Sequence, residues 1–327
     1  MTKTGKILTV FGCVCLALVI FLSIWYLGAS YPDFSYKERF EIPGLKYGFV
    51  PQGICRIDDP KQWLVSGYMA DGTSSRVYLV DEKTGKAQKY FTLLDGSVAL
   101  DGHFGGIACS GDDVWVVSEG MVYHFYTFDI FDVSDGKQVK VVDKFDSQTK
   151  ADFCFANEEI FVVGEFNRDG KYGTQGHELE RNDGHTNKAY AVVFGVGNGK
   201  YGLKTDNLGR LSPLAVYSLP DKVQGFCMAG NKIVLSTSYN LLDSKIYVFD
   251  TQIGGVVAGA GQVSIMNSTV PLRALWADRA TQTITAPAMS EGLDYFDGQV
   301  YMNFESACTK YKLFNRTRTK HVLSFKI

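Results

Sequence analysis

Short apolar runs alternate with polar turns along the chain from about residue 40 to its end. The runs are a few residues long, rich in Val, Ile, Phe and Tyr, and soon reach a Gly, Asp or Asn. Runs of this kind, with turn residues roughly every 8–12 positions, predict short β-strands joined by tight turns. The composition of the 327 residues agrees, because 34 are Gly, only 8 are Pro and 13% are aromatic.

One stretch of this pattern recurs roughly every 50–70 residues. Each copy begins with an apolar strand, crosses a polar turn and enters a second apolar strand. The first strands are predicted at Gln52–Ile57, Gly106–Cys109, Asp152–Ala156, Gln224–Met228 and Glu291–Tyr295. The second strands are predicted at Trp63–Tyr68, Val114–Ser118, Ile160–Glu165, Ile233–Ser238 and Val300–Glu305. A repeat of this period with four short strands per copy predicts an all-β fold, a five-bladed β-propeller over residues 40–327.

The outer strands of the blades follow from the same pattern. They are predicted at Ser75–Asp81, Gln88–Leu94, Tyr123–Asp132, Val139–Phe145, Ala189–Gly195, Ser244–Asp250, Gly261–Met266 and His321–Ile327. The fifth repeat stops one strand short, which would leave an open sheet edge, a known liability. Phe40–Leu45 is therefore predicted to close the ring as the missing strand. Tyr201–Pro220 and Val270–Ala286 could each hold a degenerate blade, so six blades are the alternative.

The N-terminal residues have a different pattern. Ile7–Leu27 is uncharged and overwhelmingly apolar, and its 21 residues match the length of a membrane-spanning helix. Lys3 and Lys6 precede it, so residues 1–6 are predicted to be a cytoplasmic tail, 7–27 a transmembrane signal-anchor and 28–39 a linker. The alternative is a signal peptide cleaved near Gly28-Ala29-Ser30, although its apolar region would be unusually long. Either reading places the propeller outside the cytoplasm, at the cell membrane if the anchor is retained.

Charge and cysteine content narrow the possibilities further. The formal net charge is −2, which gives no basic excess for a nucleic-acid partner. Five cysteines follow the anchor, and an odd number does not indicate a disulfide scaffold. Four of them fall at similar places in the repeats, so most are predicted to be free, buried, small core residues: Cys55, Cys109, Cys154 and Cys227.

The first-strand starts Gln-Gly-Ile and Glu-Gly-Leu, with third strands that read Tyr-Leu-Val-Asp and Tyr-Val-Phe-Asp, resemble those of the YVTN, NHL and SMP-30/arylesterase-like propellers. The resemblance covers most of the chain after the anchor, at the level of strand pattern. Propeller enzymes of that kind hold a catalytic calcium ion with acidic and Asn residues in the central channel. Only Glu291 has an obvious counterpart position here, so the resemblance implies the fold and leaves a channel-bound calcium open.

Candidate site residues come from the position that begins each first strand, because these positions face one mouth of the channel. They are Gln52, His103, Asp152, Gln224 and Glu291, and the second strands add Glu119, Glu165 and Glu305 at their ends. One interpretation is a ring of polar groups that binds a small molecule, a glycan or a protein. The other is that these groups only satisfy the crowded backbone of neighbouring blades.

Two further hypotheses are carried by charged residues. A pair of carboxyl groups among Glu291, Asp152 and Glu305 could hydrolyse a glycoside or an ester, although no nucleophile motif accompanies them. The insertion 167–187 contains two histidines and three carboxylates within Gly176–His185, but their spacing matches no zinc pattern and favours a solvated loop. The sequence therefore predicts a membrane-anchored binding module first, a hydrolase second and a scaffold of an envelope complex third.

Overall fold

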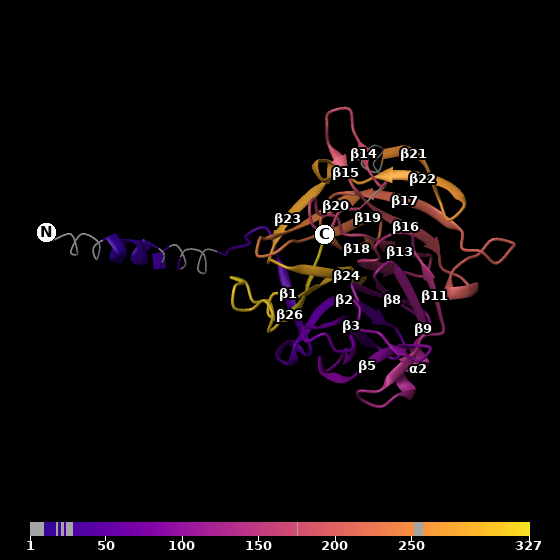
Figure 1. Ribbon diagram of the computed structural model, residues 1–327, viewed down its shortest axis with the longest axis horizontal. Coiled ribbons are helices and arrows are strands. Elements are labelled where there is room, and N and C mark those ends of the chain that lie inside the picture. The colour runs from indigo at the N-terminus through magenta and orange to yellow at the C-terminus, as the bar shows by residue number, and fades with distance from the viewer. Residues whose placement is uncertain (1–9, 18, 21–22, 24–28, 175, 252–257) are drawn as a thin grey trace.

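The computed structural model describes residues 10–17, 19–20, 23, 29–174, 176–251 and 258–327. Within these residues five β-sheets stand around a central channel as the blades of a propeller, which confirms the five-bladed prediction (Figure 1). The innermost strands are β2 (Phe49–Ile57), β7 (Gly106–Ser110), β12 (Phe153–Ala156), β18 (Val223–Ala229) and β24 (Ser290–Phe296). Each inner strand contacts the inner strands of both neighbouring blades, so the ring is closed.

The remaining strands of the blades run outward from the channel. Blade 1 adds β3 (Gln62–Met69), β4 (Arg76–Asp81) and β5 (Ala87–Asp95), and blade 2 adds β8 (Asp113–Ser118), β9 (Met121–Tyr126) and β11 (Asp143–Asp146). Blade 3 adds β13 (Ile160–Gly164), β16 (Ala189–Gly195) and β17 (Pro213–Leu219), and blade 4 adds β19 (Lys232–Thr237), β20 (Ser244–Asp250) and β23 (Gln282–Ala286). Blade 5 adds β25 (Gln299–Phe304), β26 (His321–Phe325) and β1 (Tyr36–Glu41).

The repeated glycine of the first strand is explained by the distance between neighbouring blades. A Cβ atom on Gly53 would lie 2.5 Å from the backbone nitrogen of Ile107, and one on Gly106 would lie 2.4 Å from that of Cys154. No side chain fits at these separations. The repeat is therefore an architectural feature that lets the inner strands approach each other closely.

Blade 5 is closed by the N-terminal strand, as the sequence predicted. β1 pairs antiparallel with β26, with Tyr36 opposite Phe325 and Glu41 opposite His321. The strand lies at Tyr36–Glu41 and not at Phe40–Leu45, because the chain turns at Gly44, whose φ is +72°, into the short 3-10 helix η1 (Leu45–Tyr47).

Aromatic side chains fill the space between blades. Trp63 of blade 1 packs on Tyr301 of blade 5, with ring centroids 4.5 Å apart, and Phe40 of β1 lies 5.9 Å from the same tryptophan. Trp115 of blade 2 packs on Phe161 of blade 3 at 5.0 Å. The hydrophobic core is thus distributed over the interfaces of the ring.

Two predicted outer strands of blade 2 are wrong. The expected strand Tyr123–Asp132 ends at Tyr126, and the helix α2 (Thr127–Asp132) follows, because the Asp129 carboxylate accepts the Tyr126 N–H at 3.3 Å and caps its first turn. The expected strand Val139–Phe145 is divided. Its first half forms β10 (Gln138–Lys140), which joins blade 1 beside β5, and only its second half, β11, belongs to blade 2.

The six-bladed alternative is also wrong for the part of the chain that the structure describes. Tyr201–Pro220 contains the end of η2 (Lys200–Gly202) and then β17, the outer strand of blade 3. The hairpin of β21 (Ala258–Ile265) and β22 (Ser268–Ala274) extends blade 3, through parallel pairing of β17 with β22. Gly261–Met266 is therefore not the outer strand of blade 4, a place that β23 takes.

The remaining elements are short. These are β6 (Val98–Ala99), which pairs with β5, the two-stranded sheet of β14 (Leu179–Glu180) and β15 (Thr186–Asn187), and η3 (Ala277–Arg279).

The cysteine prediction is wrong for one pair. Cys55 of β2 and Cys109 of β7 form a disulfide between blades 1 and 2, with their Cα atoms 6.2 Å apart. The close approach that Gly53 permits brings these two inner strands within disulfide distance. Cys154 and Cys227 are free and buried, as predicted, and so is Cys308.

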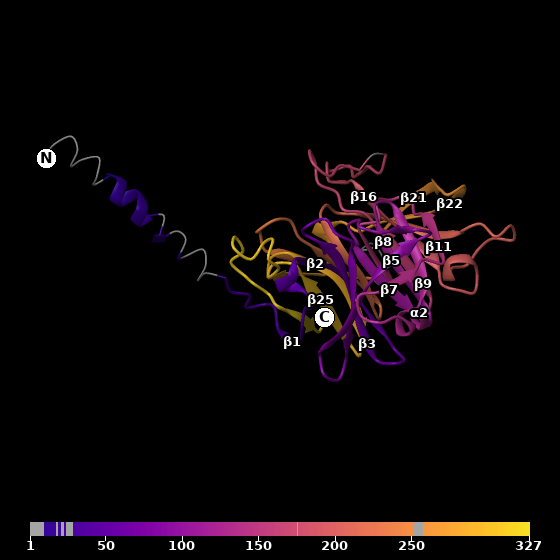
Figure 2. The same ribbon diagram turned by 60° about the horizontal axis from the view of Figure 1, so that its bottom comes forward.

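The N-terminal segment projects from one side of the propeller (Figures 1 and 2). Residues 10–17 are helical, and the apolar side chains of Val10, Phe11 and Leu16 are exposed. Among the described residues, no helix has both the length and the apolar character needed to span a membrane. The predicted tail 1–6 and residues 7–9, 18, 21–22 and 24–27 of the predicted span lie outside the described residues.

Candidate functional site at the channel mouth

A cavity of about 550 Å³ opens where the inner strands begin. Five of the eight candidate residues line it together: Gln52, His103, Asp152, Gln224 and Glu305. Gln52, Asp152 and Gln224 occupy equivalent positions in three blades, where Asp152 directly precedes β12 and Gln224 and Gln52 are the second and fourth residues of β18 and β2. In blade 2 this position is Gly105, where a Cβ would lie 2.3 Å from the Asp152 carbonyl oxygen, and His103 reaches the mouth instead.

A chain of hydrogen bonds crosses the floor of this cavity. The buried Gln52 donates from Nε2 to Glu305 Oε2 at 3.0 Å and to its neighbour's carbonyl, Pro51 O, at 2.8 Å. Its Oε1 is 2.8 Å from His103 Nε2. Because both partners of the amide nitrogen are acceptors, the amide oxygen must accept the proton of His103 Nε2. The network thus fixes the tautomer of the histidine.

His103 is neutral at physiological pH. The residue is exposed at the rim, and one face of its ring packs on the Tyr68 ring, with centroids 4.4 Å apart. Loss of hydration, with a smaller effect from the Lys310 ammonium, lowers the pKa of His103 to about 4. Because Nε2 carries the proton, the neutral imidazole can only accept a hydrogen bond at Nδ1.

Glu305 and Glu291 form a coupled pair of carboxyl groups at the junction of blades 5 and 1. Burial raises the pKa of Glu305 to about 7, although the hydrogen bond from Gln52 and the charge of Lys310 act in the opposite direction. Burial and then the charge of Glu305 raise the pKa of Glu291 well above its usual value. Glu291 is 1% exposed and does not line the cavity, and its Oε1 has no hydrogen-bond partner among the described residues. The pair therefore retains at least one proton near neutral pH, and only Glu305 can touch a ligand.

Asp152 lies on a different wall of the mouth. Burial raises its pKa to about 6, while the Phe166 N–H, 2.7 Å from Oδ2, and the Lys150 charge oppose that effect and Glu165 reinforces it. Like Glu305, Asp152 can change protonation near neutral pH.

Glu165 and Glu119 lie outside the main cavity. Glu165 is buried and accepts the Tyr190 N–H at 2.9 Å, the Lys150 N–H at 3.2 Å and a hydrogen bond from His177 Nδ1, so it fastens the insertion to blade 3. Glu119 is exposed in the turn after β8 and lines a smaller neighbouring cavity of about 320 Å³.

The insertion 167–187 is a tethered loop. The His177 ring stacks on Tyr190 at 4.4 Å, and Arg181 forms a bidentate ion pair with Asp278 of η3. His185 Nδ1 is 3.1 Å from Asp183. In the described ranges no group of three or more His, Cys, Asp or Glu side chains is placed to hold a metal ion, here or in the channel.

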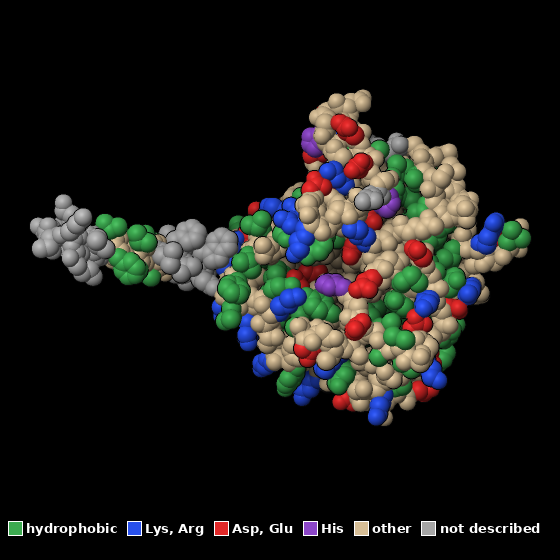
Figure 3. All heavy atoms as spheres, in the orientation of Figure 1, with side chains coloured by type: hydrophobic (Ala, Val, Ile, Leu, Met, Phe, Trp, Pro, Cys, Tyr) green, Lys and Arg blue, Asp and Glu red, His purple; other side chains and the backbone are tan. Residues whose placement is uncertain are grey.

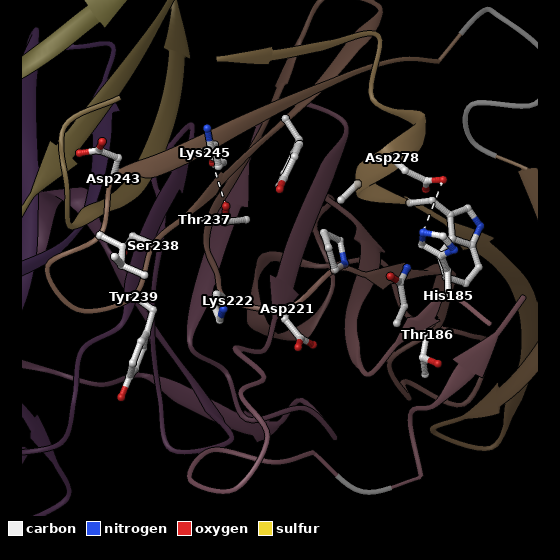
Figure 4. Close-up of a pocket in the computed structure, with 16 residues that line it drawn as sticks. His185, Thr186, Asp221, Lys222, Thr237, Ser238, Tyr239, Asp243, Lys245 and Asp278 are labelled. Atoms are coloured by element: carbon white, nitrogen blue, oxygen red, sulfur yellow. Dashed lines mark hydrogen bonds and ion pairs between the residues drawn. The ribbon is translucent and has the colours of Figure 1, made fainter. Parts of the chain in front are cut away.

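A second cavity of about 370 Å³ lies between the insertion and blade 4 (Figure 4). Three of its charged side chains are engaged with residues outside the lining: Asp278 with Arg181, Asp243 with Tyr31, and Lys245 with Thr285. None of the eight candidate residues lines it. The channel mouth, where amides and titratable carboxyl groups converge, is therefore the stronger candidate site.

The sequence did not identify the aromatic side chains of the mouth. The cavity is also lined by Tyr68, Phe166, Tyr172, Tyr239 and Tyr311. Three of them share a signal that could have been used, because Tyr68, Phe166 and Tyr239 lie at or just past the end of a second strand, where Glu305 also lies. Tyr172 and Tyr311 come from loops whose paths only the fold reveals.

Replacing Glu305 with Gln is expected to flatten the dependence of stability on pH. The folded pKa of about 7 lies above the ordinary glutamate pKa of 4.5, so the native protein holds a proton that the unfolded chain releases. The associated stability is fully present below about pH 4.5 and is lost as the pH rises through 7. We expect Glu305→Gln to reduce this loss by about 2 kcal/mol, measured by urea unfolding at pH 4.5 and 7.5. The exposed Glu158→Gln is the matched control, and parallel curves for both variants would contradict the account.

Comparisons with known proteins find only distant structural likenesses. No protein-family model matches the chain, and no curated protein matches it. Among solved structures, BamB from Moraxella catarrhalis is 11% identical, with 85% of each chain covered and a TM-score of 0.33. The computationally designed Ika8 protein is 11% identical, with 89% of this chain and all of that chain covered and a TM-score of 0.35. Hsv2 from Kluyveromyces lactis is 11% identical at a TM-score of 0.31; the match covers 78% of this chain but only 56% of Hsv2.

The fold is that of a β-propeller. We take the function from the residues of the channel mouth, because similarity at this level carries no argument about ligands or partners.

Proposed function

We propose that this protein is a membrane-anchored, extracytoplasmic propeller that binds a small polar ligand, with a glycan as the favoured class, at its channel mouth. The observation that carries the proposal is the lining of the 550 Å³ cavity. The lining combines aromatic side chains with the side-chain amides of Gln52, Gln224 and Asn240. The volume is within the usual range of about 300–1,000 Å³ for small-molecule sites.

The chemistry of the lining suits a polyhydroxylated ligand. Tyrosine rings offer flat apolar faces for the C–H faces of a sugar ring, and their hydroxyl groups remain available for hydrogen bonds. Amides both donate and accept, and a carboxyl group accepts or, when protonated, donates, so neighbouring hydroxyl groups can be satisfied in pairs. The lining also contains one basic side chain, Lys171, in addition to the carboxyl groups of Asp152 and Glu305.

Two observations support the proposed location. Apolar side chains of the N-terminal helix are exposed, and burial of this surface in a bilayer would remove it from water. The disulfide between Cys55 and Cys109 fits an oxidising compartment, because such bonds rarely persist in the cytosol. Resistance of the full chain to alkaline carbonate extraction tests the anchor, and release into the supernatant would refute it.

A thermal-shift screen of the purified protein against mono- and oligosaccharides, with amino acids and nucleosides as other classes, tests the binding function. A ligand at 100 times its Kd stabilises the native state by about 2.7 kcal/mol, which is readily measured as a rise in Tm. We expect saccharides to raise Tm in a saturable manner. A flat response to all saccharides, with a saturable response to another class, would refute the glycan assignment and retain a binding module.

Hydrolysis is a second candidate, favoured by one observation. The cavity holds two carboxyl groups, Glu305 and Asp152, whose pKa values of about 7 and 6 suit an acid and a base near neutral pH. Glu291, the third group of the sequence-based hypothesis, is buried away from the cavity and could only modulate Glu305. Release of nitrophenol from nitrophenyl glycosides or esters tests this candidate, and activity retained by Glu305→Gln would refute it.

A further inference from the structure

The loop between β25 and β26 has an unusual composition. From residue 306 to the last residue the sequence contains no Asp or Glu, whereas the loop contains five basic residues: Lys310, Lys312, Arg316, Arg318 and Lys320. In its middle, Leu313 and Phe314 are each 68% exposed. The next residue, Asn315, is fully buried, with Nδ2 3.0 Å from Met289 Sδ and Oδ1 accepting the Thr317 N–H at 3.1 Å. Asn315 thus fixes the loop so that the two apolar side chains face outward.

This loop lies beside the point where the N-terminal segment joins the propeller. Tyr31 donates a hydrogen bond to Asp243 at 2.8 Å, and Arg316 forms an ion pair with the same carboxylate. The predicted span ends at Leu27, four residues before Tyr31. Four residues reach at most about 14 Å even when fully extended. A bilayer that holds the predicted span is therefore close to Asp243 and to the loop.

Two other exposed side chains lie in the same area. Leu242, next to Asp243, is 64% exposed. Tyr47 is 77% exposed at the end of η1, and η1 is joined to the loop by the bond from Thr309 N–H to Leu45 O at 3.2 Å. We call Tyr47, Leu242, Leu313 and Phe314, with the exposed Lys312, Arg318 and Lys320 of the loop, the anchor-side surface. In Figure 3, apolar and basic side chains both occur on the side of the propeller from which the N-terminal segment leaves.

We propose that the anchor-side surface rests on the membrane, with its apolar side chains in the headgroup region and its basic side chains on lipid phosphates. The proposal rests on the membrane anchoring proposed above. Apolar side chains rimmed by Lys and Arg are the pattern of interfacial membrane contacts, and a basic segment close to a span is attracted to anionic lipids. Adjacency to the anchor favours lipid over a protein partner, because the anchor keeps the bilayer, and no other partner, permanently within reach.

The contact would connect the membrane to the candidate site. Tyr311 belongs to the same loop and lines the cavity, where its hydroxyl lies 3.3 Å from that of Tyr68. Lys310 donates to the Tyr68 hydroxyl at 2.8 Å. Tyr311, which forms part of the cavity wall, is therefore three residues from Phe314 in the chain. Membrane contact at Phe314 would place the channel mouth beside the bilayer surface.

Quenching by lipid tests the contact in the full chain. Phe314→Trp is compared with Leu208→Trp in nanodiscs of phosphatidylcholine and phosphatidylglycerol, with and without bromine on the acyl chains. Leu208 is 74% exposed in the loop between η2 and β17, which extends on the side away from the N-terminal segment in Figure 1. The signal of the wild-type tryptophans is subtracted. Both substituted side chains are exposed, so folding is expected to be retained, which circular dichroism checks.

We expect brominated lipid to quench the added fluorescence of Phe314→Trp at least twofold and to leave that of Leu208→Trp unchanged. Quenching of Phe314→Trp should weaken when phosphatidylglycerol is omitted or when Lys312 is replaced by Glu. Equal quenching of the two variants, or none, in protein that resists carbonate extraction would overturn the membrane contact and leave the anchor intact. Protein that carbonate extracts would overturn the anchor and the contact together.

Discussion

Deletion of Tyr36–Glu41 is expected to destroy the cooperative unfolding of the whole propeller. β1 is the outermost strand of blade 5, and its loss would expose the edge of β26 and open the core between blades 5 and 1. Because each inner strand depends on both neighbours, damage at this junction is transmitted around the ring. Differential scanning calorimetry of the full chain measures the effect. A single transition at the wild-type Tm would show that β1 does not close the ring.

A graded version of this prediction uses single substitutions. Phe40 of β1 is buried against Trp63, so Phe40→Ala is expected to lower the free energy of unfolding by about 3–4 kcal/mol. Phe128→Ala removes the same atoms from a half-exposed position on α2 and should cost less than about 1 kcal/mol.

Loss of the Cys55–Cys109 disulfide is the second large effect that we expect. The bond closes a loop of 54 residues, and in the chain-entropy account such a cross-link stabilises the native state by about 4 kcal/mol. The double variant Cys55→Ala, Cys109→Ala should therefore unfold at markedly lower denaturant concentration than the wild type. Reductant should lower the stability of the wild type to a similar extent. It should not change the stability of the double variant, which therefore serves as the control for other effects of the reductant.

Thiol titration checks the same bond without mutation. The unfolded, unreduced protein should titrate five of its seven cysteines, because Cys13, Cys15, Cys154, Cys227 and Cys308 are free. Seven reactive thiols would show that the bond does not form, and would remove one support for an oxidising compartment.

The architecture could be predicted because its determinants are local and repeated. Gly53, Gly106, Gly225 and Gly292 mark the inner strands, since each faces the backbone of the next blade too closely for a side chain. The short fifth repeat indicated that an N-terminal strand would complete it. Outer strands were less predictable because their partners are not fixed by chain order. The hairpin β21–β22 lies in sequence between two strands of blade 4 but joins blade 3.

The site was predictable in part for the same reason. Equivalent positions of the inner strands face the mouth in blades 1, 3 and 4, so Gln52, Asp152 and Gln224 could be placed there from the sequence. Glu291 occupies the equivalent position but is buried. The repeat pattern of the sequence does not predict this difference, because it depends on how the side chains pack. The disulfide and the loop tyrosines depend on distances between blades and on loop paths. The span of residues 7–27 stays a prediction from hydropathy.

Calorimetric titration of the purified full chain with the best ligand from the screen tests the central claim most directly. Gln224→Ala and Tyr239→Ala alter opposite kinds of surface in the cavity, an amide and an aromatic face, while Gln88→Ala is an exposed control on blade 1. The loss of one hydrogen bond or one stacked ring within a closed site costs about 1.4 kcal/mol or more, which is tenfold in Kd. The account predicts that Gln224→Ala and Tyr239→Ala each weaken binding at least tenfold while Gln88→Ala binds as the wild type does. Wild-type affinity in both cavity variants would contradict it.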